Sequence, residues 1–294
     1  MDSRSSERLV VFGCGYVGAE MARQAVARGL RVTALTRNAE RAAALRGAGV
    51  ETVVADLADP DWHARIEGGP ARVLDCVSSG GARLDGYRRS YVDGMRSILA
   101  WARARGPAGT VVYTGSTSVY PQGGGAVVDE SAPAGGADGR AALLLEAERL
   151  LREAEGACAR AFVLRLAGIY GPGRSHLLEQ VRAGEVAGRG EHRLNLIHRD
   201  DVCAAAWAAF DAPAAVAGGT FNVADDGAAP KREIADWLAG RLGLPPPRFT
   251  GAPAAGRRAV TPDRVIANAR IKAVLGWRPR FPDFRAGYEN LLSR

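Results

Sequence analysis

The sequence predicts an α/β protein with a doubly wound parallel sheet and a smaller part built mostly from the C-terminal third. Short apolar runs alternate with helical stretches through the first two-thirds of the chain, which is typical of strand–helix–strand units. A glycine-rich turn directly follows the first apolar run. The alternation stops near residue 168, where turn-rich segments such as GIYGPGRSH begin.

Each apolar run is short enough for a strand and apolar enough for burial on both faces, as in a sheet covered by helices on both sides. The predicted strands are RLVVF (8–12), RVTALT (31–36), ETVVA (51–55), RVLDCV (72–77), TVVYT (110–114) and AFVLRL (161–166). Helical patterns cover residues 16–28, 40–47, 87–105 and 141–155. Right-handed crossovers between these strands then give the doubly wound sheet.

The glycine-rich turn VVFGCGYVG has the spacing G-x-G-x-x-G between a predicted strand and a predicted helix. Glycines at these positions allow a tight turn, a close approach of the backbone to a pyrophosphate and close packing of the helix. The N–H groups at the start of the helix attract the phosphates. We therefore predict dinucleotide binding by Gly13, Cys14, Gly15, Tyr16, Val17 and Gly18, although Cys14 is expected mainly to pack.

The end of the second strand distinguishes NADP from NAD. An NAD site usually has an acidic residue about 20 residues after the glycines, on the ribose hydroxyls, whereas this chain has Thr36, Arg37 and Asn38. We expect Arg37 to pair with the 2′-phosphate of NADP; NAD, with Arg37 as a solvated loop residue, is the alternative. The other predicted cofactor contacts, at the ends of the third and fourth strands, are Asp56, Leu57, Val77, Ser78 and Ser79.

Composition argues against several other classes of protein. The net charge is +7, but arginines are spread along the chain without the basic patch that nucleic-acid binding needs. No apolar run reaches the roughly 20 residues of a membrane span, and the start MDSRSSER lacks a signal core. Four cysteines without C-x-x-C spacing predict no metal site. We expect a soluble, cytoplasmic protein that binds no nucleic acid, membrane or metal.

Several motifs, in the same order, resemble the extended short-chain dehydrogenase/reductase family, which includes epimerases and dehydratases. They are GCGYVG (13–18), ADL (55–57), YVDGMRSIL (91–99), YTGSTSVYP (113–121), RLAGIYGPGR (165–174), IHRDDVCAAA (197–206), FNVADD (221–226) and LGWRPRF (275–281). The resemblance covers nearly the whole chain and implies a Rossmann domain. Together with the pattern above, it predicts a dinucleotide-binding domain of residues 1–168, completed by 194–225, and a substrate-binding domain of residues 169–193 and 226–294.

The resemblance implies a catalytic hydroxyl at the end of the fifth strand and a Tyr-x-x-x-Lys pair on the next helix. Ser116, four residues before Tyr120, matches the hydroxyl, and Thr117 and Ser118 follow as substrate contacts; a serine cluster closing a turn is the alternative. The pair is missing, because no tyrosine in the chain has a lysine four residues later. This loss and the shortened glycine motif resemble the family's atypical branch.

The helix that should carry the pair looks structural instead. The family pattern Y-G-R-S-K-x-x-x-E falls on DGRAALLLE, with Asp138 and Ala142 in place of tyrosine and lysine. Asp138 is most simply an N-cap, although a replacement acid is the alternative. An apolar stripe predicts packing, and Glu148 with Arg152 is expected to form a surface pair.

A proton donor must then come from elsewhere in the chain. Tyr91 stands where relatives commonly carry an asparagine beside the active site, and His198 has an imidazole, the side chain suited to acid–base chemistry near neutral pH. A packed aromatic and a structural histidine are the respective alternatives. Tyr170 and Arg174 are expected to contact an anionic substrate.

Two functions remain open. The first is an NADP(H)-dependent oxidoreductase or epimerase acting on a small carbonyl or sugar-like substrate, with a non-standard proton donor. The second is a catalytically silent NADP-binding sensor or scaffold. A homodimer through the fourth and fifth helices and a monomer are both compatible with the sequence.

Overall fold

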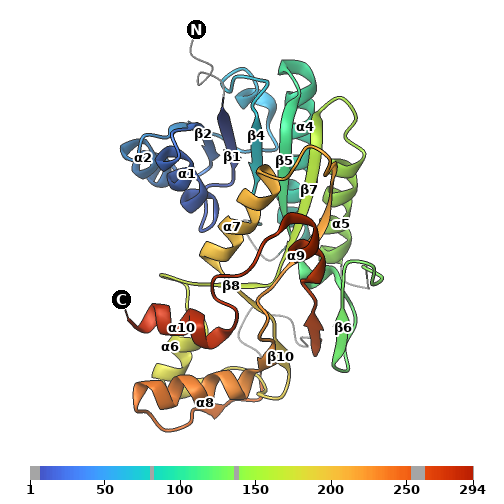
Figure 1. Ribbon diagram of the computed structural model, residues 1–294. Helices are drawn as coiled ribbons and strands as arrows, with labels where there is room; N and C mark the ends of the chain where they lie inside the picture. Colours follow the sequence, from blue (N-terminus) through green and yellow to red (C-terminus); the bar gives the residue numbers. More distant parts are fainter. Residues whose placement is uncertain (1–6, 80–82, 136–138, 253–261, 294) are drawn as a thin grey trace. The chain divides into compact units, whose positions relative to one another are not determined.

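The computed structural model describes residues 7–79, 83–135, 139–252 and 262–293 (Figure 1). The chain divides into two compact units. The first comprises Met1–Val119, Ala134–Arg165 and Ala205–Phe221, and the second comprises Tyr120–Pro133, Leu166–Ala204 and Asn222–Arg294. The domain limits expected from the sequence stay a prediction.

A seven-stranded sheet in the order β12-β7-β5-β4-β1-β2-β3 runs through the described residues of the first unit (Figure 1). β1 pairs in parallel with β2 and β4, β2 with β3, and β4 with β5. All six predicted strands are present, and β12 is a seventh that the sequence patterns did not predict. The strands are β1 (Arg8–Phe12), β2 (Arg31–Thr36), β3 (Glu51–Val54), β4 (Arg72–Asp75), β5 (Ala108–Ser116), β7 (Cys158–Leu166) and β12 (Gly218–Val223).

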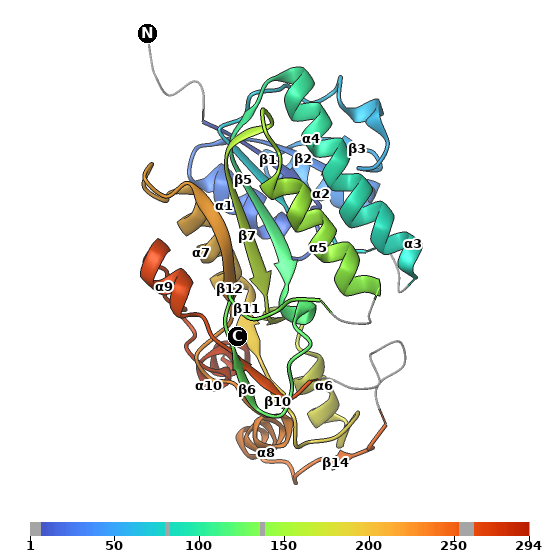
Figure 2. The same ribbon diagram turned by 90° about the vertical axis from the view of Figure 1, so that its right-hand side faces the viewer.

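Helices cover both faces of this sheet, which confirms the predicted doubly wound fold. In Figure 2, α4 and α5 lie in front of the sheet, and α1, α2 and α7 lie behind it. These helices are α1 (Gly18–Ala27), α2 (Ala39–Gly47), α4 (Gly94–Arg105), α5 (Gly139–Arg152) and α7 (Arg199–Phe210). None of the helices in the described ranges has the length and apolar character that crossing a membrane requires.

The helix before β5 contains a local irregularity. A short α-helix, α3 (Leu84–Tyr87), continues into a π-helical segment, η3 (Arg88–Asp93), and then into α4. π-Helical turns are rare and often occur at functional sites. This turn carries Tyr91.

An aromatic cluster anchors the loop that follows β3. The rings of Phe12, Trp62 and Trp101 lie 5.0–5.7 Å apart, and all three are fully buried. The indole N–H of Trp62 donates to the carbonyl of Leu57, and that of Trp101 donates to the carbonyl of Ile66. Because buried indoles need a partner for this donor, the contacts tie the loop to the core.

Glu148 of α5 forms the expected i,i+4 pair with Arg152, but the prediction that this is a surface pair is wrong, because Glu148 is fully buried. Its main partner is Arg165 of β7, whose Nε and Nη2 donate to the two carboxylate oxygens at 2.9 and 2.7 Å. Arg152 is half-exposed and reaches the same carboxylate only at 3.4 Å. The i,i+4 spacing does not reveal that β7 places a guanidinium beneath the helix. Asp138, the expected N-cap, lies outside the described residues.

The second unit consists of short two-stranded pairings and short helices around a separate core. β8 (Gly168–Tyr170) pairs in parallel with β11 (Leu196–His198), and β6 (Ala126–Val128) with β15 (Arg264–Ile266). β9 (Glu185–Val186) pairs with β14 (Arg248–Phe249), and β10 (Arg193–Leu194) with β13 (Ala229–Pro230). The helices are α6 (His176–Arg182), α8 (Lys231–Leu242), α9 (Ala269–Leu275) and α10 (Phe284–Leu292).

Candidate cofactor pocket and active site

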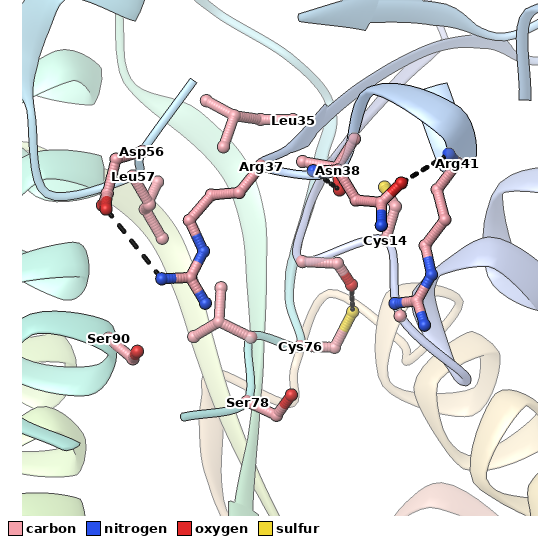
Figure 3. A pocket seen from close by; sticks show the side chains of 14 residues that line it. Cys14, Leu35, Arg37, Asn38, Arg41, Asp56, Leu57, Cys76, Ser78 and Ser90 are labelled. Atoms are coloured by element: carbon pink, nitrogen blue, oxygen red, sulfur yellow. Dashed lines mark hydrogen bonds and ion pairs between the residues drawn. The ribbon is translucent and has the colours of Figure 1, made fainter. Parts of the chain in front are cut away.

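A pocket of about 380 Å³ lies where the strands of the first unit end (Figure 3). Ten of the residues predicted to bind a cofactor line it: Gly13, Cys14, Gly15, Thr36, Arg37, Asn38, Asp56, Leu57, Val77 and Ser78. The predicted Tyr16, Val17, Gly18 and Ser79 are not among the lining residues. The sequence reasoning missed Leu35, Arg41, Cys76 and Ser90.

The three glycines of the turn serve different purposes. Gly13 has φ +87°, and a Cβ there would lie 2.5 Å from the backbone nitrogen of Val77. A Cβ at Gly18 would clash with the Gly13 carbonyl and lie 2.7 Å from the sulfur of Cys76. At Gly15 the nearest atom is the Arg41 Nη1, 3.8 Å away, so the backbone there is open to the pocket. This cradle fits the pyrophosphate of a dinucleotide.

Replacing Gly13 by alanine is expected to abolish this fit. The substitution combines a positive φ, which costs an L-residue roughly 1–2 kcal/mol, with overlap against backbone that cannot move aside. We expect at least about a 10-fold loss of dinucleotide affinity, since about 1.4 kcal/mol corresponds to that factor. Titration of NADPH fluorescence measures it. Gly47→Ala, where nothing lies within 4 Å, is the control, and equal affinities for the two variants would contradict the expected role of Gly13.

Cys14 lies in the turn as a packed thiol. Its side chain is buried, and its sulfur faces the carbonyl of Val11 at 3.8 Å. Burial raises the pKa of the Cys14 thiol to about 12, against a smaller lowering by Arg41. The thiol is therefore protonated at neutral pH, in line with the expectation that it packs.

Two arginines lie on different sides of the pocket. Figure 3 shows Arg37 extending toward Asp56, with an Nη1–carboxylate distance of 3.9 Å, whereas Arg41 lies on the side of Cys14. Asn38 caps α2 by accepting from the N–H of Arg41 at 2.8 Å, and Thr36 Oγ1 accepts from the N–H of Asn38 at 3.2 Å. Thr36 and Asn38 thus shape the turn that carries both guanidinium groups. In the sequence, Arg41 lies four residues after Arg37, in the first turn of α2.

Asp56 is ionised and held by arginine. Its Oδ2 accepts from Arg89 Nε at 3.1 Å, and Arg89 also bridges to Asp59 at 2.9 Å. Burial alone would raise the pKa of Asp56, but the N–H of Ala58 and the guanidinium of Arg89 bring it below its usual value. Its predicted contact with the cofactor stays a prediction.

Tyr91 projects from the π-helical turn toward the loop after β4. Its hydroxyl accepts from the backbone N–H of Ser79 at 3.3 Å, and its ring lies 5.4 Å from that of Tyr87. Burial raises the pKa of Tyr91 to about 12, although the Ser79 N–H lowers it. The side chain is therefore protonated at neutral pH, so that it has a proton to give but cannot act as a base.

Ser116 is the last residue of β5. Its hydroxyl donates to Ser118 Oγ at 3.0 Å and accepts from the N–H of Ser118 at 3.1 Å. Thr117, between them, is buried. These bonds close the turn after the strand, and the half-buried Ser116 also lies where a doubly wound sheet binds ligands. Both predicted interpretations of this cluster therefore stay open.

The buried glutamate changes how α5 aligns with the family pattern. In Y-G-R-S-K-x-x-x-E the glutamate comes eight residues after the tyrosine, and Glu146, the earlier match, is only half-buried and pairs with Arg96. Counting back from the buried Glu148, we infer that Arg140 and Leu144 occupy the tyrosine and lysine positions. The Arg140 guanidinium lies 5.3 Å from the ring centroid of Tyr87. Neither alignment supplies a phenol or an ammonium group on this helix.

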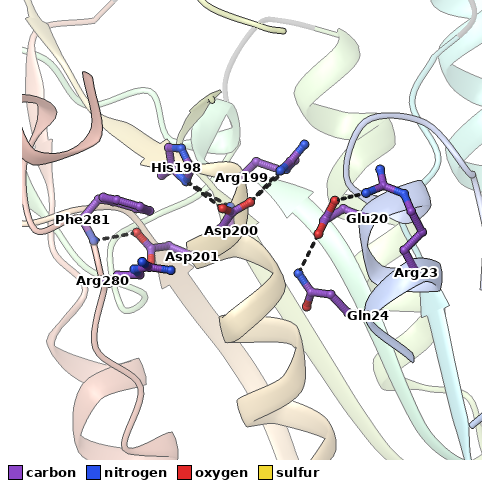
Figure 4. A network of polar contacts seen from close by, with 9 residues as sticks. All are labelled: Glu20, Arg23, Gln24, His198, Arg199, Asp200, Asp201, Arg280 and Phe281. Atoms are coloured by element: carbon purple, nitrogen blue, oxygen red, sulfur yellow. Dashed lines mark hydrogen bonds and ion pairs between the residues drawn. The ribbon is translucent and has the colours of Figure 1, made fainter. Parts of the chain in front are cut away.

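Two predicted site residues are enclosed within the second unit. His198 is fully buried, with its ring 4.2 Å from that of Phe281, and its Nδ1 accepts from the N–H of Asp200 (Figure 4). Tyr170 packs in the core against Tyr288, with the rings 4.9 Å apart, and its hydroxyl abuts Gly287. These contacts favour structural roles, because neither side chain faces solvent.

Arg174 lies on the surface of the second unit. The turn that presents it is closed by reciprocal backbone hydrogen bonds with Gly171 at 2.9 and 3.1 Å. The side chain is exposed, which is compatible with the predicted contact to an anionic substrate. That contact stays a prediction.

Comparisons with known proteins agree with this architecture. The NAD dependent epimerase/dehydratase family matches residues 9–224. The chain is 30% identical to a 3-diazoavenalumate denitrifying reductase of a Streptomyces species (95% of this chain, 98% of that protein) and 27% identical to Protein YeeZ of Escherichia coli K12 (94% and 97%). A solved structure of a putative NAD-dependent epimerase/dehydratase from Methylobacillus flagellatus is 31% identical, with a TM-score of 0.74 over 98% of both chains. The chain therefore belongs to the NAD dependent epimerase/dehydratase family, as an NAD(P)-dependent oxidoreductase or epimerase with a short-chain dehydrogenase/reductase fold.

Proposed function

We propose that this protein is an NADP(H)-dependent oxidoreductase that acts on a small carbonyl or sugar-like substrate and uses Tyr91 as its proton donor. The observation that carries the proposal is the presence of two guanidinium groups, Arg37 and Arg41, in the pocket next to the glycine turn. A phosphate between them would be bound by charge-assisted hydrogen bonds. Asp56, the carboxylate that lines the same pocket, is bound by Arg89.

The chain's own groups then have separate tasks. NADP, when bound, supplies or accepts a hydride. The turn at Gly13 and Gly15 accommodates the pyrophosphate, and Ser116 orients the substrate oxygen. Tyr91, held by the Ser79 N–H, gives its proton to that oxygen. The name of the Streptomyces relative, a reductase, supports this reaction class.

A catalytically silent NADP-binding sensor is the second candidate. The observation that favours it is the missing Tyr-x-x-x-Lys pair: the two lysines of the chain, Lys231 and Lys272, are both in the second unit. Such a protein would bind NADPH through the same arginines but would reduce no carbonyl compound.

Incubation with NADPH and a panel of ketones, aldehydes and sugar nucleotides separates the two candidates. Because a positioned proton donor contributes about 10²–10⁴-fold, we expect Tyr91→Phe to lower kcat at least 100-fold while NADPH affinity is unchanged. Ser116→Ala is expected to lower kcat as well, and Tyr87→Phe, the neighbouring phenol, serves as the matched control. Tight NADPH binding without turnover of any compound would favour the sensor, and turnover that survives Tyr91→Phe would remove Tyr91 from the mechanism.

We further propose that the protein acts in the cytoplasm on a small-molecule substrate. A homodimer through α4 and α5 stays a prediction. These two helices are joined to each other by an ion pair between Arg96 and Glu146 at 2.8 Å.

A further inference from the structure

The carboxylate of Asp56 lies between two arginines at the edge of the cofactor pocket. Its Oδ2 accepts a hydrogen bond from Arg89 Nε at 3.1 Å and lies 3.9 Å from the Nη1 of Arg37. Asp56 and Arg37 line the pocket, and Figure 3 shows the guanidinium of Arg37 directed at this carboxylate. The arginine proposed to bind the 2′-phosphate of NADP therefore already has a carboxylate beside it.

A negative charge at this place opposes the binding of a phosphate. The Asp56 carboxylate repels a phosphate bound by Arg37 and competes with it for the same guanidinium. The Asp56 side chain is only 26% exposed, so water screens these effects in part. NADH has a ribose hydroxyl instead of this phosphate, and a carboxylate can accept a hydrogen bond from that hydroxyl. An uncompensated Asp56 would therefore favour NADH over NADPH.

Arg89 compensates this charge by binding two carboxylates of the loop after β3. Its Nε donates to Asp56, and its Nη2 donates to Asp59 Oδ1 at 2.9 Å. Both hydrogen bonds are charge-assisted and are therefore stronger than neutral ones. The contact of Arg37 with Asp56, at 3.9 Å, is longer than a hydrogen bond. Arg89 thus holds the carboxylate, and the guanidinium of Arg37 can bind another anion.

The π-helical segment η3 positions Arg89 against this loop. Ser90, the next residue, lines the pocket, and Tyr91 reaches the loop after β4. A Cβ at Gly94, the first residue of α4, would lie 3.0 Å from Leu57 Cδ2, so the helix packs closely on the loop after β3. Three successive residues of the π-helical turn therefore contact the pocket or the loops beside it.

We propose that Arg89 determines the preference for NADP over NAD, because it neutralises Asp56 and leaves Arg37 to bind the 2′-phosphate. This inference rests on the proposed NADP(H)-dependent function. Arg89 is not among the residues that line the pocket. It acts through Asp56 and is therefore a positioning residue, whereas Arg37 and Arg41 are the groups proposed to contact the phosphate.

Fluorescence titration with NADPH and with NADH tests this role. The ratio of the NADH to the NADPH dissociation constant measures the preference, and changes that affect the shared parts of the two cofactors cancel in it. Arg89→Ala is expected to lower this ratio roughly 5-fold, the upper range for an exposed charge pair. Adding Asp56→Asn to Arg89→Ala should restore the wild-type ratio, because no carboxylate is then left to compensate.

The matched control is Arg88→Ala, which removes the same charge from the neighbouring exposed position of the π-helical turn. It should leave the ratio unchanged, and a fall as large as in Arg89→Ala would show a general effect of charge and contradict the proposal. Equal losses of affinity for both cofactors in Arg89→Ala, or a ratio that Asp56→Asn does not restore, would also overturn it.

The same titrations separate this inference from the proposed function. A wild-type protein that binds NADH as tightly as NADPH would refute the NADP assignment and the role of Arg89 together. A wild-type preference for NADPH that Arg89→Ala retains would refute only the role of Arg89. If the ratios change as expected but no compound is reduced, the proposed catalytic function fails and the role of Arg89 in cofactor selection stands.

Discussion

Replacing both Arg37 and Arg41 by alanine is expected to weaken NADPH binding about 100-fold or more, with little effect on NADH. A hydrogen bond to a charged group contributes about 1.5–3 kcal/mol, so loss of two such contacts corresponds to at least two factors of 10. NADH lacks the 2′-phosphate, so its affinity should fall only by the weak attraction between the two arginine charges and the rest of the cofactor. Fluorescence titration of both cofactors, on the single and double variants, measures the difference.

The control for this prediction is Arg46→Ala. Arg46 lies in the last turn of the same helix, α2, and bonds to Thr52 away from the pocket. The Arg46→Ala substitution removes one positive charge but does not remove a residue that lines the pocket. An equal loss of NADPH and NADH affinity in the double variant would mean that the arginines only support the turn. A loss in Arg46→Ala as large as in Arg37→Ala would indicate a long-range field instead of a phosphate contact.

Glu148→Ala is expected to lower the free energy of unfolding by about 3–5 kcal/mol, because it removes the carboxylate that is paired with the buried guanidinium of Arg165. Arg165 is 5% exposed and gives two hydrogen bonds to Glu148. Replacing both residues by methionine should recover most of the loss, since a buried ion pair contributes little over a packed apolar pair. Urea unfolding, monitored by circular dichroism, measures both variants against the wild type.

The matched control is Glu146→Ala on the same helix. Glu146 is only half-buried and pairs with Arg96, whose side chain is 51% exposed. A pair of this kind contributes about 0–1 kcal/mol. Similar losses for Glu146→Ala and Glu148→Ala would show that helix propensity, and not the buried pair, determines the effect.

Local sequence patterns determined the fold and most of the cofactor pocket. Apolar runs at strand length gave six strands of the sheet, and the spacing of Gly13, Gly15 and Gly18 located the turn that joins the first strand to the first helix. Arg37 and Asp56 could be placed at the pocket because each lies within two residues of the end of a strand of a parallel sheet. Such strands end at a common edge, so a position just after a strand already implies a position in space.

Only the tertiary structure decided which polar side chains are buried and which residues lie next to them. The helical period puts Glu148 four residues before Arg152, and only the packing of β7 beneath α5 shows that its partner is Arg165. The register of β4 against β5 brings Asp75 beside Tyr113, 38 positions later in the chain. Likewise, only the tertiary structure shows that His198 and Tyr170 are buried inside the second unit.

Strand and turn preferences arise from neighbours within a few residues, and the sequence by itself therefore determined the doubly wound sheet, the glycine cradle and the missing Tyr-x-x-x-Lys pair. Burial of a charge depends on which distant segment covers it, through contacts that no local period encodes. For this reason only the tertiary structure decided that Arg41 joins Arg37 in the pocket, that Glu148 pairs inside the core, and that Asp75 lies buried beside Tyr113.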